Sequence, residues 1–174
     1  MRLTSVALFS LLGASSLAAQ SSGENPRESQ LRMLENQRQL LLSMADSMPE
    51  RLYRDKATPQ QRDFTQQIHH AAGSAIYIAN DAAGGSSPAL PDTARVFNTR
   101  AGLKQYVNGA YDYLAGLLRS ETAASRIQSY SLFGQQMPRW QVWDEIHTHT
   151  VWTAGQAVAN FRKHGMAPPS FTFF

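Results

Sequence analysis

The sequence of 174 residues contains no cysteine. This absence excludes disulfides, thiolate metal ligands, a thiol nucleophile and haem attachment through Cys-x-x-Cys-His. After the first twenty residues there is no apolar run long enough to span a bilayer. The 16 Lys and Arg residues and 13 Asp and Glu residues are scattered, without a basic block. This charge pattern argues against a nucleic-acid-binding protein.

The N-terminal stretch differs in composition from the rest of the chain. Arg2 precedes a short apolar run at residues 6–17, and small residues follow at Ala18 and Ala19. This pattern is typical of a secretory signal peptide. We expect residues 1–19 to be a cleaved signal and residues 20–28 to be a flexible lead. The mature protein is then expected to be exported, periplasmic or extracellular, with no membrane span.

Four segments repeat apolar residues at helical spacing, and no segment shows sustained strand alternation. The expected helices cover residues 28–53, 58–81, 99–121 and 138–164. Thr58 is expected to cap the second helix with Pro59 in its first turn, and His164-Gly165 is expected to end the fourth. Long connections at 82–92 and 122–136 join them. The pattern predicts an all-α four-helix bundle over residues 29–170, with a long connection between helices 2 and 3. Residues 171–174 form a short tail.

The second expected helix carries two adjacent histidines. At about 100° per residue, His70 falls in a row with Ser74 and Tyr77, beside the apolar stripe of the helix. His69 is expected to point to the polar side. His70 is therefore the half-buried member of the pair and the better candidate for a ligand.

The last expected helix carries two histidines that are two residues apart. His147 shares the apolar face with Trp140 and Trp143, and we expect it to be a hydrogen-bonded core histidine. His149 lies about 160° around the helix from His147, in a row with Thr153. A regular helix cannot turn both histidines toward one ion. His149 is either a polar residue at the edge of the core or a ligand facing His70.

Two runs of residues resemble a known family. The run His149-Thr-Val-Trp-Thr153-Ala-Gly155-Gln156, with Pro168-Pro169 after it, resembles the last helix of the DinB/YfiT-like superfamily. The run Phe64-Thr-Gln-Gln-Ile-His69-His70-Ala-Ala-Gly73 resembles the second-helix motif of the same family. The resemblance implies a four-helix bundle that holds a divalent metal, often nickel or zinc, on three histidines from helices 2 and 4.

Carried over residue by residue, the resemblance places metal ligands at His70 and His149. The third ligand position falls on Thr153, and a threonine hydroxyl is a poor ligand for such an ion. The implied function is a divalent-metal-dependent hydrolase or transferase with an incomplete histidine triad, acting on a small-molecule substrate. The alternative is a non-catalytic small-molecule-binding or structural bundle that has lost the metal. No phosphate loop or Ser-His-Asp order indicates another reaction. Either protein is expected to be a monomer or a homodimer.

Overall fold

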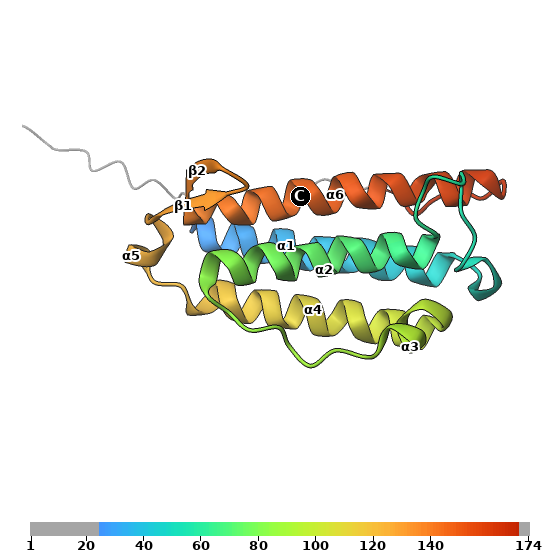
Figure 1. Ribbon diagram of the computed structural model, residues 1–174, viewed down its shortest axis with the longest axis horizontal. Coiled ribbons are helices and arrows are strands. Elements are labelled where there is room, and N and C mark those ends of the chain that lie inside the picture. Colours follow the sequence, from blue (N-terminus) through green and yellow to red (C-terminus); the bar gives the residue numbers. More distant parts are fainter. Residues whose placement is uncertain (1–24, 171–174) are drawn as a thin grey trace, which may run out of the picture.

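The computed structural model describes residues 25–170, and in this range the protein is mainly helical (Figure 1). Its long helices run side by side and are α1 (Pro26–Ser47), α2 (Phe64–Ala83), α4 (Arg100–Ser120) and α6 (Arg139–Lys163). The short elements are η1 (Glu50–Leu52), α3 (Thr93–Asn98), α5 (Ala123–Arg126), β1 (Ser129–Leu132) and β2 (Gln135–Pro138). The expected signal peptide and the tail at 171–174 lie outside the described residues.

Helix α1 begins and ends for local reasons that its sequence contains. The Asn25 side chain accepts a hydrogen bond from the Arg27 amide at 3.0 Å, and Pro26 occupies the first turn. The helix ends at Ser47 because Met48, which precedes Pro49, is extended. The expected helix over residues 28–53 is therefore an α-helix that begins earlier, followed by the separate short helix η1.

Helix α2 begins at Phe64, so the expected start at Thr58-Pro59 is wrong. The Asp63 carboxylate accepts from the Gln66 amide at 2.7 Å, and the Gln66 side chain accepts from the Asp63 amide at 3.1 Å. This reciprocal capping box satisfies two amides that the helix leaves unpaired. Thr58 and Pro59 lie in the preceding turn. The Thr58-Pro59 pair belongs to a turn, in which the Thr58 carbonyl accepts a hydrogen bond from the Gln61 amide at 3.1 Å.

The two long connections, from α2 to α4 and from α4 to α6, contain structure that the sequence did not predict. The first crosses from α2 to α4 and includes α3, which Asp92 caps. The second contains α5 and an antiparallel hairpin in which Leu132 pairs with Gln135. The hairpin turn is Phe133-Gly134, with φ of 47° and 85°. Positive φ at both residues is typical of a two-residue turn that matches the twist of its strands. The expectation of no strands is therefore corrected, and the strands are too short to show alternation.

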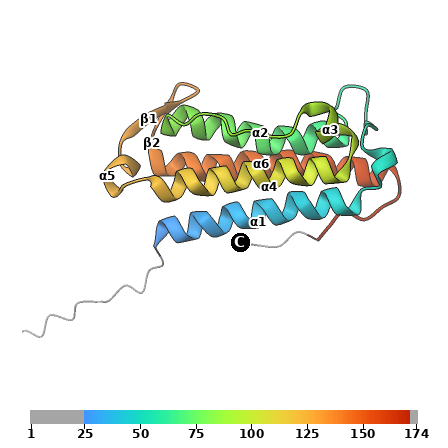
Figure 2. The same ribbon diagram turned by 90° about the horizontal axis from the view of Figure 1, so that it is seen from below.

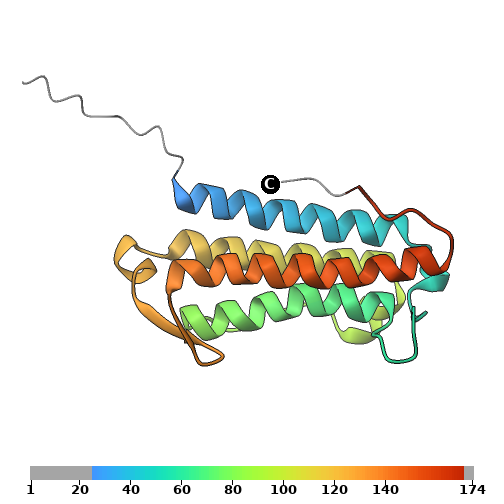
Figure 3. The same ribbon diagram turned by 90° about the horizontal axis from the view of Figure 1, so that it is seen from above.

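The helices pack around one core. Helix α2 packs against α6 and α4, and α1 packs against the same two helices (Figures 2 and 3). The largest fully buried side chains are contributed by all four long helices and the α1–α2 connection: Tyr53, Tyr111, Phe64, Phe161, Leu41, Met48 and Ile68 among them. Burial of these apolar side chains is the main source of stability. Among the described residues, no helix has the length and apolar character needed to cross a membrane.

Candidate functional site

Two histidines from different helices meet at the interface between α2 and α6. The ring centroids of His70 on α2 and His149 on α6 are 5.2 Å apart, and the rings are inclined at 71°. The helical-wheel argument placed each histidine at the edge of its apolar face, and the structure brings these two edges together. The two residues that sequence resemblance singled out as ligands are therefore neighbours.

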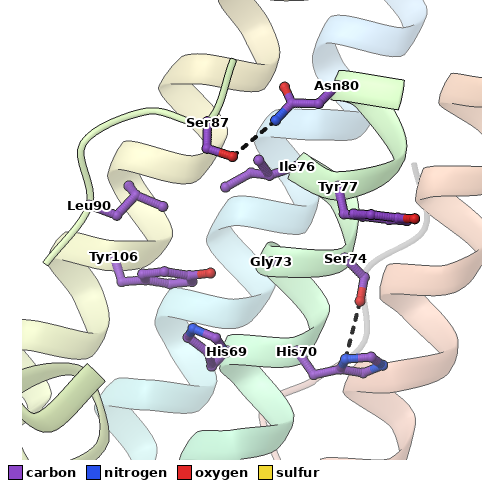
Figure 4. A pocket seen from close by; sticks show the side chains of 10 residues that line it. All are labelled: His69, His70, Gly73, Ser74, Ile76, Tyr77, Asn80, Ser87, Leu90 and Tyr106. Carbon is purple, nitrogen blue, oxygen red and sulfur yellow. Dashed lines mark hydrogen bonds between the residues drawn. The ribbon is translucent and has the colours of Figure 1, made fainter. Parts of the chain in front are cut away.

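The His70 ring is fixed by its own helix. Its Nδ1 lies 3.1 Å from the Ser74 hydroxyl, one turn along α2 (Figure 4). When that hydroxyl accepts the Nδ1 proton, the lone pair of Nε2 is left for a ligand, as in many metal sites. The pKa of His70 is lowered mainly by burial and further by the positive charge of Arg62. The ring is therefore uncharged at neutral pH, which is the form that binds metals.

His149 differs from His70 because its Nδ1 is buried and has no hydrogen-bond partner among the described residues. An unsatisfied buried nitrogen is destabilising. Burial, and then the charge of Arg62, lower the pKa of His149. The ring is thus neutral as well. Its unpaired nitrogen is the feature of this site that packing alone does not explain.

The position of the third expected ligand lies one turn after His149. Thr153 is 2% exposed, and its carbonyl oxygen accepts a hydrogen bond from Nε2 of Gln67 at 3.2 Å. Gln67 also donates to the side-chain oxygen of Gln156 at 2.9 Å, so it ties α2 to α6 beside the histidines. Within residues 25–170, no group of three His, Cys, Asp or Glu side chains is arranged to hold a metal. The residues present fit two of the three positions of a histidine triad.

The buried face of α6 is rotated from the expected face. Its centre lies at Ile146, Thr150 and Ala157, and Trp140, expected on this face, is 40% exposed. His147 and His149 lie at opposite edges of this face, at about 80° on either side of its centre. The expected face was displaced because polar threonines, which sequence alone assigns to the surface, are buried here.

His147 faces α1 instead of the His70–His149 pair. Its Nδ1 lies 3.1 Å from the side-chain nitrogen of Gln37, which is fully buried. The Tyr111 hydroxyl donates to the other end of the Gln37 amide at 3.3 Å. Burial lowers the pKa of His147. The expectation of a hydrogen-bonded packing histidine is confirmed, although the ring is half-buried at the edge of the core.

His69 does not point to the polar side, which corrects the sequence-based expectation. Its ring stacks on Tyr106 of α4, with centroids 4.5 Å apart and planes inclined at 27°, and it meets the edge of Phe97 at 5.1 Å. Burial lowers the pKa of His69. The α3–α4 segment covers this side of α2, and no periodicity in α2 itself signals that cover.

A cavity of about 380 Å³ lies on this side of α2 (Figure 4). Its walls come from α2, from α4 and from the connection that follows α2. The ten lining residues are His69, His70, Gly73, Ser74, Ile76, Tyr77, Asn80, Ser87, Leu90 and Tyr106. Two small residues of α2, Gly73 and Ser74, are among them.

Sequence reasoning missed Arg62, whose charge acts on both histidines of the pair, and Gln67 and Gln37, which hold the helices beside them. No spacing pattern marks these residues. No protein-family model matches the chain, and no curated protein matches it. The resemblance to the DinB/YfiT-like superfamily therefore rests on the two sequence runs given above.

Proposed function

We propose that this protein is a DinB-like four-helix bundle that binds a divalent metal ion, nickel or zinc, through His70 and His149. The observation that carries the proposal is the meeting of two neutral imidazoles from α2 and α6, one of them with an unpaired buried nitrogen. A ring nitrogen that carries no proton can donate its lone pair to a metal ion. The resemblance supports the same two residues independently of their distance.

In this proposal the protein is an exported hydrolase or transferase that acts on a small molecule. A metal ion held by imidazoles lowers the pKa of a bound water or thiol. His70 and His149 hold the ion, and the Ser74 hydroxyl orients the His70 ring. Thr153 lies where a third histidine would complete the family's set, so the ion is held by fewer protein ligands and more weakly.

Metal binding to the purified protein tests the proposal. The protein is incubated with Ni²⁺ or Zn²⁺ and dialysed, and the retained metal is measured. We expect about one equivalent in the native protein and a loss of retention in His70→Ala and in His149→Ala. The matched control is His147→Gln on the same helix, which should retain the ion. Retention below about 0.1 equivalent for every divalent metal would overturn the proposal.

The second candidate is a non-catalytic small-molecule-binding or structural bundle that has lost the metal. Arg62 favours it, because a guanidinium that disfavours protonation of both imidazoles also repels a metal cation. Arg62→Ala separates the two candidates. If the site holds a metal, this substitution tightens Ni²⁺ binding. If neither the native protein nor the variant retains metal, the non-catalytic candidate stands.

A further inference from the structure

The cavity beside α2 has the composition of a site for an uncharged ligand. Its volume of about 380 Å³ lies within the range of ~300–1,000 Å³ that is usual for small-molecule sites. None of its ten lining residues is Asp, Glu, Lys or Arg. These lining side chains therefore offer no counter-charge to a charged ligand, which would leave part of its hydration behind on binding.

The Tyr106 hydroxyl is a buried polar group that this cavity leaves unpaired. The side chain is 6% exposed, and its hydroxyl has no hydrogen-bond partner among the described residues. Burial raises the pKa of Tyr106 to about 12, so the group remains protonated and can both donate and accept. A Cβ on Gly73 would lie 2.8 Å from this oxygen, so glycine leaves room for the hydroxyl beside α2.

Other parts of the wall are apolar or already hydrogen-bonded. Asn80 donates to the Ser87 hydroxyl at 3.2 Å and accepts from the Tyr113 hydroxyl, which holds the connection against α2. Ile76 and Leu90 supply apolar surface (Figure 4). A ligand that fits these walls needs an apolar body and one polar group aimed at Tyr106.

We propose that this cavity binds an uncharged molecule with one flat ring and one carbonyl or hydroxyl group that hydrogen-bonds to Tyr106. The ring lies between the apolar walls formed by Ile76 and Leu90. The proposal goes beyond the metal site and does not depend on it, because the binding groups are on the α4 side of α2. The cavity also reaches His70, so a ligand held here would lie next to the histidine pair.

Three ring compounds of matched shape test the charge of the ligand. Benzamide is neutral, benzoate is an anion and benzamidine is a cation, and each is titrated into the full protein. The ring resonances of His69 and Tyr106 are followed by NMR. We expect benzamide to give saturable shifts and the charged compounds to bind at least about tenfold more weakly. Equal affinity for a charged compound, or no saturable shift with benzamide up to its solubility limit, would overturn the proposal.

The role of the hydroxyl is tested by Tyr106→Phe, which keeps the ring. Benzamide binding should weaken by about five- to tenfold. The matched control is Tyr111→Phe on the same helix, whose hydroxyl bonds to Gln37 and does not line the cavity. If Tyr106→Phe does not fold, Leu90→Ala removes an apolar wall in the connection and should weaken binding as well. Unchanged affinity in the cavity variant used would contradict the proposal.

The titration is repeated with EDTA and in His149→Ala. Benzamide should bind equally well in both, because no part of the binding requires a metal ion. Loss of binding under either condition would show that the metal site holds the compound, and would overturn the cavity proposal. Failure of the metal-retention experiment leaves this result unaffected, so the two proposals fail separately.

Discussion

The two adjacent histidines of α2 lie in contrasting environments. His69 faces α4, where its ring is stacked on Tyr106 and meets Phe97. Phe97 in turn lies under the guanidinium of Arg54 at 5.2 Å, so aromatic and cation–π contacts stabilise this flank. His70 faces α6, where its partner His149 has a buried nitrogen without a hydrogen bond. The His69 ring is packed between aromatic side chains, whereas the His149 ring keeps a nitrogen without a partner.

This difference shows how one helix can serve stability and binding at once. A step of about 100° between neighbouring residues turns identical side chains toward different helices. On the α4 side the His69 ring packs against Tyr106 and Phe97. On the α6 side no neighbouring polar group of the described residues bonds to Nδ1 of His149. Unsatisfied groups of this kind are retained at functional sites at a cost in stability.

The largest expected effect is on the α4 flank, from Tyr106→Ala. Removing this buried ring takes away the stacking surface of His69 and leaves a cavity, so the free energy of unfolding should fall by about 3–5 kcal/mol. Urea denaturation measures the change. The control is Tyr77→Ala, because Tyr77 is 64% exposed and its loss should change stability by less than about 0.5 kcal/mol. A loss below about 1 kcal/mol for Tyr106→Ala would show that this flank is not held by packing.

The next effect is on the α6 flank, from Thr153→His. A third imidazole at the position that the family resemblance indicates should tighten Ni²⁺ binding by at least the ~10–100-fold that outer-shell partners contribute. Isothermal titration calorimetry measures the affinity. Thr153→Gln adds similar bulk without a ring nitrogen and controls for overpacking at this buried position. Equal affinities in the histidine and glutamine variants would count against a metal at this site.

A pair of leucine substitutions should change stability in opposite directions. His149→Leu removes the unpaired nitrogen and should raise the metal-free free energy of unfolding by about 1 kcal/mol. His69→Leu loses the stack on Tyr106 and should lower it by about 0.5–1.5 kcal/mol. Thermal and urea denaturation in EDTA measure both. If both variants are destabilised equally, the contrast between the two flanks is wrong.

The pH dependence of stability should reflect both flanks together. Burial lowers the pKa of His69, His70, His147 and His149, so the folded state binds fewer protons than the unfolded state. The free energy of unfolding is then unaffected by these groups well above the unfolded pKa of ~6.5 and falls as the pH drops through that value toward the lowered folded pKa. Urea titrations from pH 8 to pH 5 measure the slope. His70→Gln should reduce it, and a pH-independent stability would contradict the burial of these rings.

The sequence by itself determined the long helices and the rows on which the histidines lie. Helical periodicity depends on neighbouring residues, so the helix expected over residues 99–121 and the end of α6 at His164-Gly165 were predicted closely. The same periodicity placed His70 and His149 at the edges of their apolar faces. Because both edges are set within single helices, this much of the site needed no knowledge of the fold.

Only the tertiary structure decided what each face meets. His69 is covered by α3 and α4, and His147 is hydrogen-bonded to Gln37. Arg62 lies near enough to His149 for its charge to act on that ring. Each of these contacts is between residues far apart in the chain. The turn at Thr58-Pro59 and the cap at Asp63 were not distinguished by sequence, since both carry cap signals. Local patterns fix which side chains share a face, whereas packing between helices fixes which nitrogen finds a partner and which does not.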